Sequence, residues 1–344
     1  MARSTIRIRG TLLLGDDKAS IARAAKIIQN GSLVAFPTET VYGLGAAATD
    51  PEAVKKIFTA KGRPSDNPLI VHIAEPEQLS DVAGQVLPAA VMLAEQFWPG
   101  PLSLVLPRAE KIAAEVSAGL STVAVRMPDH EVALDLIRAA GVPIAAPSAN
   151  RSGRPSPTSY IHVLEDLAGR IDAVIRSGAC LIGLESTVLD LTGSRPVILR
   201  PGGVSRERLE TALGCRVIVS GLNKESGRPR SPGMKYRHYA PRAPLVLIAG
   251  PESRRRLLIA AIVESCQQKG LHVGVLSSFI KGSARGLTPA LSEPEQLAAN
   301  LYQALRQMDK RGIDLILAEE TEIKGLGLAV MNRLRKAAIR VLKV

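Results

Sequence analysis

Short apolar runs alternate with amphipathic stretches along most of the chain. Residues 17–30 carry apolar side chains at helical spacing, and Asn30-Gly31 follows as a helix end. The apolar run at residues 32–36 predicts a short buried strand. The same pattern continues with strands predicted at residues 68–73, 102–106, 122–127, 142–146, 184–190 and 197–203, and helices at 87–97 and 130–140.

The clearest helix signal follows Asp50. Asp50 can cap the first turn and Pro51 suits that turn. The apolar stripe comes from Ala53, Val54, Ile57 and Phe58. We expect the helix to end at Gly62. Its neighbours Lys61 and Arg63 are then expected to project from the turn, where a small anion can meet them. A solvated basic helix end is the alternative, because cations are common at helix C-termini.

The last hundred residues repeat the alternation on a smaller scale. Strands are predicted at 244–249, 271–276 and 313–318, with helices at 252–269, 293–311 and 326–338. Strands that alternate with helices of this length indicate a small parallel α/β unit. With the linker-like composition before it, the pattern predicts a first domain at residues 1–218, a linker at 219–244 and a second domain at 245–344.

The linker ends in unusual chemistry for a spacer. Its second half gathers Lys235, Tyr236, Arg237, His238 and Tyr239. Either these residues belong to a solvated tether, or the linker is a lid that closes on an anionic substrate.

Composition narrows the class of protein. Hydrophobic residues make up 46% of the chain and aromatic residues only 3%, so the cores must be aliphatic and a platform of stacked rings for single-stranded nucleic acid is not expected. Three distant cysteines without a C-x-x-C pair argue against a disulfide framework or a zinc cluster, and they fit a reducing cytoplasm. The sequence contains no run of eighteen apolar residues, so neither a membrane-spanning segment nor an export signal is predicted.

Positive charge is concentrated outside the first domain. The net charge is +12, yet residues 1–218 contain 23 basic and 22 acidic residues. Residues 219–244 contain 6 basic and 1 acidic residue, and residues 245–344 contain 15 and 9. The basic residues of the first domain are therefore expected to act by their placement rather than through a general basic surface.

Polar residues follow several of the predicted strands. Residues 37–45 form a predicted loop with three hydroxyls and two glycines, and Pro147 to Gly153 follow another strand. Ligands of α/β folds usually bind beyond strand ends of this kind. Arg126 lies within an apolar strand, so it must either pair with a carboxylate in the core or point into a cleft.

Five segments in order resemble one known family. They are P-T-E-T-V-Y-G-L-G at 37–45, K-G-R-P-S-D-N-P-L at 61–69, P-S-A-N at 147–150, E-S-T-V at 185–188 and R-P-G at 200–202. Together they resemble the YrdC-like family.

The remainder of the chain extends the resemblance. The segment S-P-G-M-K-Y-R-H-Y-A-P at 231–241 and the α/β tail are similar to the long, two-domain form of that family, the threonylcarbamoyl-AMP synthases. The resemblance implies a twisted mixed sheet with a basic concave cavity, followed by a linker and a Rossmann-like parallel α/β domain. It also implies a nucleotidyltransferase that joins L-threonine, bicarbonate and ATP into threonylcarbamoyl-adenylate and releases pyrophosphate and water.

The implied chemistry needs positioning and charge stabilisation rather than a covalent nucleophile, and no Ser-His-Asp or Cys-His arrangement is present. Mg²⁺ is expected to arrive with ATP, and no dedicated metal site is expected. A separate transferase would then modify the adenosine beside the tRNA anticodon, so contact with tRNA would be indirect.

The resemblance assigns side chains to two ends of a site. Catalytic roles fall on Lys61 and Arg63. The residues expected to bind ATP are Lys61, Arg63, Asn67, Thr122, Ser148, Asn150, Ser156, Arg200 and Tyr239. The residues expected to bind threonine are Thr38, Thr40, His72, Arg126, the backbone at Ala146, and Ser186. Thr38 and Thr40 are too close in sequence to be separated, and Arg126 is the expected partner of the threonine carboxylate.

Two other functions compete with this interpretation. A non-catalytic module for double-stranded RNA or tRNA would bind in a salt-sensitive manner and would ignore threonine. Carbamoyl transfer, as in hydrogenase-maturation proteins that embed a similar domain, would come with zinc-finger cysteines and extra domains that this sequence lacks. The near-neutral first domain is compatible with a monomer, and the sequence assigns no role to the second domain.

Overall fold

The computed structural model describes residues 6–220, 238–277 and 294–344. Contacts divide the chain into two compact units. The first comprises Met1–Ser152 and Ser156–Tyr236, and the second comprises Gly153–Pro155 and Arg237–Val344. The predicted boundaries at residues 218 and 244 stay a prediction, because most of the linker lies outside the described residues. The lid interpretation of the linker stays one for the same reason.

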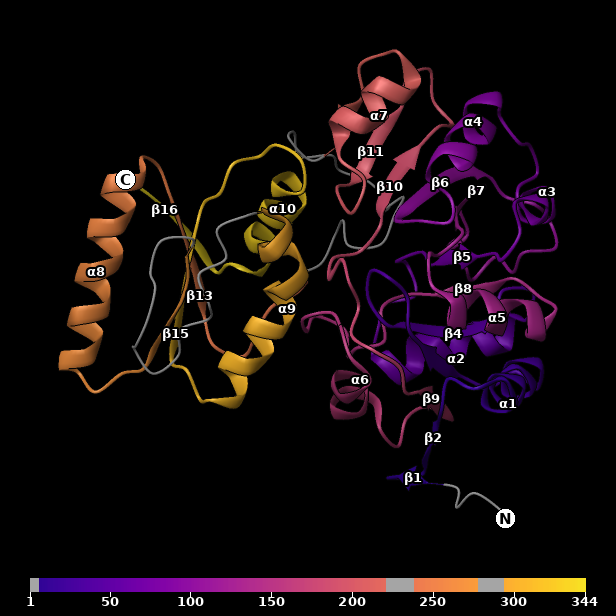
Figure 1. Cartoon of the computed structure of the whole chain (residues 1–344), viewed down its shortest axis with the longest axis horizontal. Helices are drawn as coiled ribbons and strands as arrows, with labels where there is room; N and C mark the ends of the chain where they lie inside the picture. The colour runs from indigo at the N-terminus through magenta and orange to yellow at the C-terminus, as the bar shows by residue number, and fades with distance from the viewer. Residues whose placement is uncertain (1–5, 221–237, 278–293) are drawn as a thin grey trace. The chain divides into compact units, whose positions relative to one another are not determined.

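A mixed sheet of twelve strands forms the centre of the first unit (Figure 1). Its strand order is β1-β2-β9-β3-β4-β8-β5-β7-β6-β10-β11-β12. The strands are β1 Arg7–Ile8, β2 Thr11–Leu14, β3 Val34–Phe36, β4 Gly43–Ala47, β5 Ile70–His72, β6 Leu102–Pro107, β7 Thr122–Arg126, β8 Ile144–Ala146, β9 Ala173–Ile175, β10 Thr187–Asp190, β11 Val197–Arg200 and β12 Ile218–Val219.

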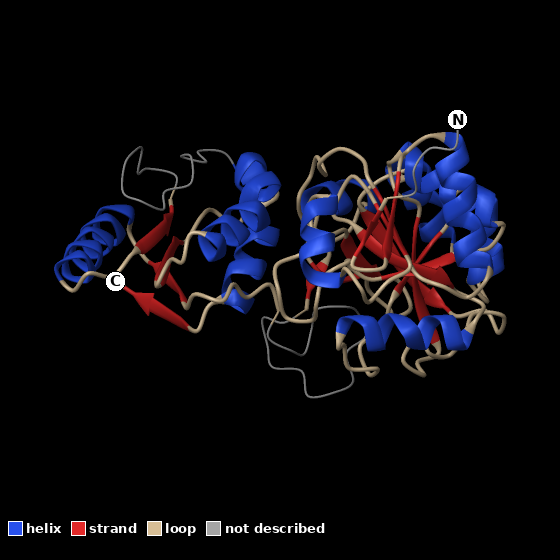
Figure 2. Cartoon of the chain, turned by 90° about the horizontal axis from the view of Figure 1, so that it is seen from below, coloured by secondary structure: helices blue, strands red, loops and turns tan. Residues whose placement is uncertain are grey.

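Helices pack on both faces of this sheet, as Figure 2 shows from a second direction. They are α1 Lys18–Gln29, α2 Pro51–Lys61, α3 Leu79–Val82, α4 Pro88–Phe97, α5 Glu131–Ala140, α6 Tyr160–Leu167 and α7 Arg206–Leu213, with a 3₁₀ turn at Pro76–Gln78. The predicted mixed α/β fold is therefore confirmed.

The two faces of the sheet carry different cores. Helices α2, α3, α4, α6 and α7 contribute to one large aliphatic core, and α1 and α5 bury their apolar sides on the other face. Further along that second face lies a small cluster made only of strand residues, and no described helix contributes to it. Its buried members are Ile70, Val105, Ala124, Val188 and Leu199. This part of the sheet carries the candidate site.

Helix α2 begins and ends where the sequence predicts. The Asp50 carboxylate accepts hydrogen bonds from two backbone N–H groups of the first turn, and Gly62 ends the helix with φ 60°. The expectation for the side chain of Lys61 is wrong. Lys61 is the last helical residue and is 2% exposed, so it lies in the interior rather than projecting from the turn.

Strand β4 corrects a second expectation. The sequence predicts residues 37–45 as a loop, whereas Gly43–Ala47 is a strand paired with β3 and β8. The segment lacks β-branched residues, so its strand character is invisible to propensity. Close packing requires small residues in this strand, because a Cβ at Gly45 would lie 2.7 Å from Ile144 Cγ2. The sequence also left β1, β2, β9, β12, β16 and helices α3, α6 and α7 unpredicted.

The second unit is built on four parallel strands in the order β14-β15-β13-β16. Its elements are β13 Leu245–Ala249, α8 Glu252–Gln268, β14 Val273–Leu276, α9 Pro294–Lys310, β15 Leu315–Glu319, α10 Gly327–Ala337 and β16 Arg340–Lys343. Helix α8 lies on one side of the sheet, and α9 and α10 lie on the other (Figure 1). The predicted parallel α/β unit is confirmed, with β16 added.

Two segments that precede β13 in the sequence also belong to this second unit. Tyr239 is 6% exposed, stacks on the ring of Tyr302 and lies under the guanidinium of Arg333. The Ala240 N–H donates to the carbonyl of Gly153, and Arg306 donates to the carbonyl of Pro155. Residues 153–155 therefore belong to this unit by contact, although they come from the first half of the sequence. No described helix is long and apolar enough to cross a membrane.

The cap at Asp50 gives a direct test of how α2 is stabilised. Asp50→Ala removes both side-chain bonds to the first turn, so we expect the free energy of unfolding to fall by about 1 kcal/mol. Asp50→Asn keeps an acceptor there and is the matched control. Denaturant unfolding of the two variants checks the prediction, which fails if both lose the same stability.

Candidate functional site

Strand β7 presents two of the predicted residues on one face of the sheet. Thr122 opens the strand and Arg126 closes it, with Ala124 between them. Because side chains alternate along a strand, these three share a face, and Ala124 belongs to the strand-only cluster there. Val123 and Val125 point to the opposite, helix-covered core. The two polar side chains thus start about 13 Å apart over an apolar floor.

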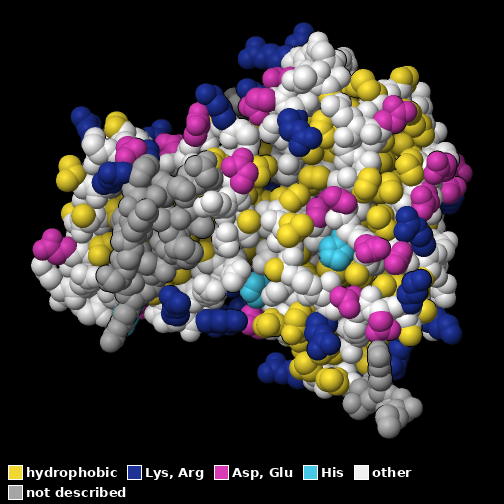
Figure 3. Space-filling model, in the orientation of Figure 1, with side chains coloured by type: hydrophobic (Ala, Val, Ile, Leu, Met, Phe, Trp, Pro, Cys, Tyr) yellow, Lys and Arg dark blue, Asp and Glu magenta, His cyan; other side chains and the backbone are white. Residues whose placement is uncertain are grey.

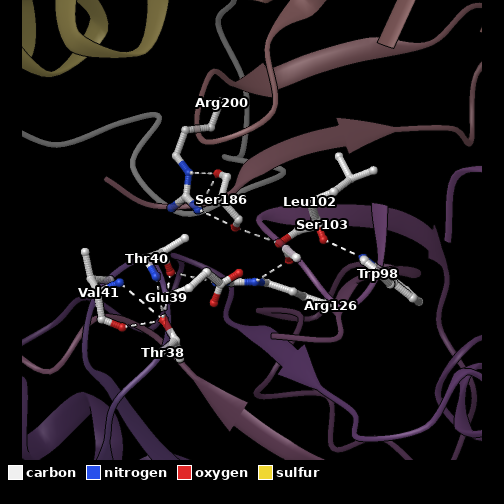
Figure 4. Close-up of polar contacts among 11 residues, drawn as sticks. Thr38, Glu39, Thr40, Val41, Trp98, Leu102, Ser103, Arg126, Ser186 and Arg200 are labelled. Atoms are coloured by element: carbon white, nitrogen blue, oxygen red, sulfur yellow. Dashed lines mark hydrogen bonds and ion pairs between the residues drawn. The ribbon is translucent and has the colours of Figure 1, made fainter. Parts of the chain in front are cut away.

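Arg126 is the centre of a buried polar group (Figure 4). Its guanidinium lies 2.5 Å from the carboxylate of Glu39, and the two side chains are 4% and 5% exposed. It also donates to the hydroxyl of Thr40 at 3.0 Å and to the carbonyl of Gly100 at 3.2 Å. Of the two possibilities left open by the sequence, the structure has the arginine paired with a buried carboxylate.

The hydroxyls of Thr38 and Thr40 lie 2.8 Å apart in the loop between β3 and β4. Thr38 closes the loop on itself, since its hydroxyl donates to the Val41 carbonyl and accepts from the Val41 N–H. Thr40 instead faces Arg126. Thr38 thus shapes the loop, while the hydroxyl of Thr40 joins the polar group around the arginine.

His72 lies beside Arg126, because β5 and β7 pair in register at these two residues. Burial, and then the positive charge of Arg126, lower the pKa of His72 to about 3. The neutral ring lies 3.2 Å from the Ile70 carbonyl through Nδ1 and packs edge-on against Phe36. His72 is therefore an uncharged wall of the group and not a second cation.

A β-bulge turns Arg200 toward this group. Val188 of β10 pairs with Arg200, but the next residue, Leu189, pairs with Ile198, so Leu199 is an extra residue in β11. Arg200 therefore shares a face with Val188, which belongs to the strand-only cluster. Its guanidinium donates to the carbonyl and hydroxyl oxygens of Ser186.

Ser186 is held from three sides. Its hydroxyl lies 2.8 Å from that of Ser103, and Arg200 contacts it from the neighbouring strand. A Cβ at Gly202 would lie 2.3 Å from backbone atoms of residues 185–187. Only glycine allows the R-P-G segment to approach the E-S-T segment this closely.

The K-G-R and P-S-A-N segments meet at the other end of β5 and β8. The ammonium of Lys61 donates to the carbonyls of Ser148 and Asn150, at 2.5 Å each. The Ser148 hydroxyl donates to the Asn150 side chain at 2.6 Å, and the Ser152 N–H donates to the Lys61 carbonyl. The structure thus brings Lys61, Ser148 and Asn150 together, as the resemblance implies.

Arg63 and Asn67 lie in the turn after α2. The guanidinium of Arg63 donates to the carbonyls of Asn67 and Pro68, so it braces its own turn. The Asn67 side chain is 1% exposed, and its amide nitrogen and oxygen have no hydrogen-bond partner within the described residues. A buried amide without a partner is costly, so this group is poised to bind a polar ligand.

The remaining predicted residues lie apart from the Lys61 contacts. Ser156 donates to the carboxylate of Glu185, whose neighbour is Ser186, so it is tied to the segment that carries Ser186. Ala146 ends β8 opposite Ile70, and Thr122 lies at the same end of the sheet. Tyr239 has its described ring contacts within the second unit, so its predicted contact with ATP stays a prediction.

Three residues of the site were missed by the sequence analysis. Glu39 and Glu185 supply the carboxylates, and Ser103 supplies a hydroxyl. Glu39 had a detectable signal, since it lies in a hydroxyl-rich segment and an arginine in an apolar strand requires a carboxylate partner. Ser103 carries no such signal, because a single serine in an apolar strand is unremarkable in sequence.

The site contains no activated thiol. Cys180 is buried beside the loop of Glu39, and burial raises the pKa of its thiol to about 12. The arrangement instead offers fixed cations, hydroxyls and amides, which suit the binding and charge stabilisation of an anionic ligand.

Comparison with known families matches nearly the whole chain. A family model described as "Telomere recombination" matches residues 26–202. A second, described as "Threonylcarbamoyl-AMP synthase, C-terminal domain", matches residues 204–339.

Relatives of similar length carry one name. A protein of Pyrococcus abyssi named threonylcarbamoyl-AMP synthase is 53% identical over 325 residues, which cover 93% of this chain and 95% of that protein. A Bacillus subtilis protein of the same name is 49% identical over 331 residues, 94% of each chain. The crystal structure of P. abyssi Sua5 complexed with L-threonine superposes with a TM-score of 0.93 at 50% identity, and the match covers 97% of this chain and all of that one.

The depressed pKa of His72 predicts a pH dependence of stability. The ring is neutral in the folded protein and charges with a pKa near 6.5 when exposed, so stability is present above about pH 6.5 and is lost as the pH falls toward 3. We expect the His72 ring signals in NMR not to titrate from about pH 5 to about pH 8. Thermal unfolding of His72→Leu should depend less on pH across the acidic range than that of the wild type. A ring that titrates near neutral pH contradicts the prediction.

Proposed function

Because the chain belongs to the threonylcarbamoyl-AMP synthase family of nucleotidyltransferases, we propose that it joins L-threonine, bicarbonate and ATP into threonylcarbamoyl-adenylate, with release of pyrophosphate and water. The adenylate would serve a separate transferase that modifies the adenosine beside a tRNA anticodon. Contact between this chain and tRNA would then be indirect.

One observation supports this proposal above the others. Two buried polar groups lie at opposite ends of the paired strands β5 and β7, with Arg126 and Glu39 at one end and Thr122 with the Lys61 contacts at the other. An amino acid and a nucleotide placed at the two ends would meet over the strand-only cluster between them. Holding two substrates in this manner is the main contribution a protein makes to such a reaction.

The threonine end follows from the buried ion pair. The carboxylate of a bound amino acid can take the place of Glu39 at Arg126, because both offer the same planar pair of oxygens to the guanidinium. Thr40 and Ser186 supply hydroxyls, His72 a neutral wall and Ala146 its backbone.

The reaction proceeds in two steps in this proposal, and each step forms one bond and breaks another. The uncharged amine of threonine attacks the carbon of bicarbonate, and loss of water leaves a carbamate. A carbamate oxygen then attacks the α-phosphorus of ATP while the bond to pyrophosphate breaks. No group on the protein is acylated, so the side chains act by position and charge.

The nucleotide end uses the cations and amides. Lys61, Arg63 and Arg200 would stabilise the charge that develops on the phosphates, and the unpartnered amide of Asn67 would bond a polar atom of ATP. The other ATP contacts in the proposal are Ser148, Asn150, Ser156, Thr122 and Tyr239. Magnesium would enter as part of the ATP substrate, held by phosphates and water.

Pyrophosphate release is the direct test of the reaction. In the wild type, release from ATP should require both threonine and bicarbonate. Lys61→Ala should lower the rate by about a hundredfold or more, because the buried ammonium orders the P-S-A-N segment and faces the phosphates.

Lys55→Ala is the matched control for that variant. Lys55 lies on the same helix but is 53% exposed, so its loss should leave the rate unchanged. Release that persists without threonine contradicts the proposed reaction. Equal rates in the two lysine variants contradict the role of Lys61.

A double variant tests Arg126 without leaving a buried charge unpaired, and a single variant isolates the effect of Glu39. In Arg126→Met/Glu39→Gln both charges are removed, and we expect the KM for threonine to rise by about tenfold or more while the KM for ATP is unchanged. In Glu39→Gln alone the competing carboxylate is lost and the arginine is kept, so the KM for threonine should fall.

Steady-state kinetics with thermal unfolding as a check on folding measures both effects. If the two variants shift the threonine KM in the same direction, Arg126 is not the partner of the threonine carboxylate.

A further inference from the structure

A pocket rich in arginine lies at the edge of the first unit, away from the site described above. It has a volume of about 520 Å³ and is lined by four arginines, Arg7, Arg9, Arg23 and Arg170. They come from the β1–β2 hairpin, from α1, and from the turn between α6 and β9. Six positions in the strand order separate β2 from β7, which is about 29 Å along the sheet. The pocket is therefore a separate place on the unit.

The hairpin turn projects Arg9 by an unusual backbone. Arg9 and Gly10 are the two turn residues, with φ 50° and 90°. A two-residue turn of this kind favours asparagine followed by glycine, since a larger side chain at positive φ is disfavoured. An arginine at this position is thus unfavourable for the turn itself. Its presence indicates a functional role for the side chain rather than a structural one in the turn.

The base of the pocket is held rigidly. The hydroxyl of Thr11, which is fully buried, donates to the carbonyl of Ile171 and accepts from the N–H of Gly169. Gly169 also lies directly against Arg9, since a Cβ there would be 3.1 Å from the Arg9 carbonyl. The two segments that carry Arg9 and Arg170 are thereby fixed against each other.

Three of the four arginines have no acidic partner within the described residues. Asp172 is the one lining carboxylate, and it already accepts a hydrogen bond from the Leu33 N–H at 2.8 Å. Arg7, Arg9 and Arg170 form no ion pair with any carboxylate in the described part of the chain. Arg7, Arg9 and Arg170 are exposed to solvent, so an anion that enters the pocket can reach their guanidinium groups.

We propose that this pocket binds a small polyphosphate, such as pyrophosphate or the triphosphate of a free nucleotide, at a second site. Guanidinium groups bind phosphate oxygens in pairs, and the volume is that of a nucleotide-sized ligand. A nucleic-acid backbone would instead need a basic surface that continues beyond the pocket. On the face that Figure 3 shows, lysine and arginine side chains are interspersed with acidic ones and form no continuous basic surface.

The stoichiometry of pyrophosphate binding tests this proposal. The full chain is titrated with pyrophosphate in a calorimeter, beside the pocket variant Arg9→Asn/Arg170→Ala. Asparagine suits the backbone at Arg9, so the turn is kept while two cations are lost. We expect the variant to bind one pyrophosphate fewer per chain than the wild type, or to bind it at least about tenfold more weakly at that site.

Arg195→Ala/Arg216→Ala is the matched control. Both arginines are exposed and adjoin β11 and β12, at the opposite edge of the same sheet, and their loss removes the same charge. The control should bind as the wild type does. Equal binding by the pocket variant and the control would overturn the proposal.

The test compares the number of pyrophosphates bound by the wild type and by the pocket variant, so its outcome does not depend on the proposed reaction. If the catalytic proposal is wrong, the wild type binds a single pyrophosphate, at the pocket, and the pocket variant binds none. Parallel titrations with ATP and AMP identify the source of the phosphates: binding of ATP at the same site indicates a nucleotide, and pyrophosphate alone indicates the reaction product. AMP binding as strong as pyrophosphate binding would overturn the proposal. A pocket variant that loses tRNA binding but still binds pyrophosphate as the wild type does would also overturn it.

Discussion

The buried ion pair between Arg126 and Glu39 is the interaction on which the site depends. Both side chains are almost fully buried, and two charges removed from water are tolerated only when they meet at close range and are further hydrogen-bonded. Thr40 and the Gly100 carbonyl supply those extra bonds. The pair draws the loop between β3 and β4 against the end of β7, and the Glu39 carbonyl fastens the same loop to the Ile182 N–H. A loop rich in hydroxyls is thereby given one conformation.

Local rules account for much of the fold. Helix α2 could be predicted from end to end, since its cap, its apolar stripe and its terminal glycine all act within a few residues. Strand β4 could not, because its glycines and alanines have no strand preference of their own and are explained by the ring of Phe36 and by Ile144. The smaller parallel sheet was predictable in type from the apolar strands β13 and β14, whereas β16 begins with Arg340, ends with Lys343 and was missed.

The site was predictable in its residues more than in its contacts. A family resemblance named Lys61, Ser148 and Asn150, and the structure adds that the ammonium bonds backbone carbonyls rather than lying open. The direction of Arg200 depends on a bulge that exists only against its partner strand, so no inspection of β11 alone reveals it. Contacts of this kind depend on pairing between distant segments, which periodicity does not report.

Residues 153–155 give the chain an interlaced connectivity. The polypeptide enters the second unit at Gly153–Pro155, leaves it at Ser156, and returns only after Tyr236. The second unit is thus completed by three residues synthesised long before the rest of it, held by Arg306 and Ala240. A gene cut within the linker would separate those residues from their partners. Cutting the linker alone therefore does not separate this protein into two complete units.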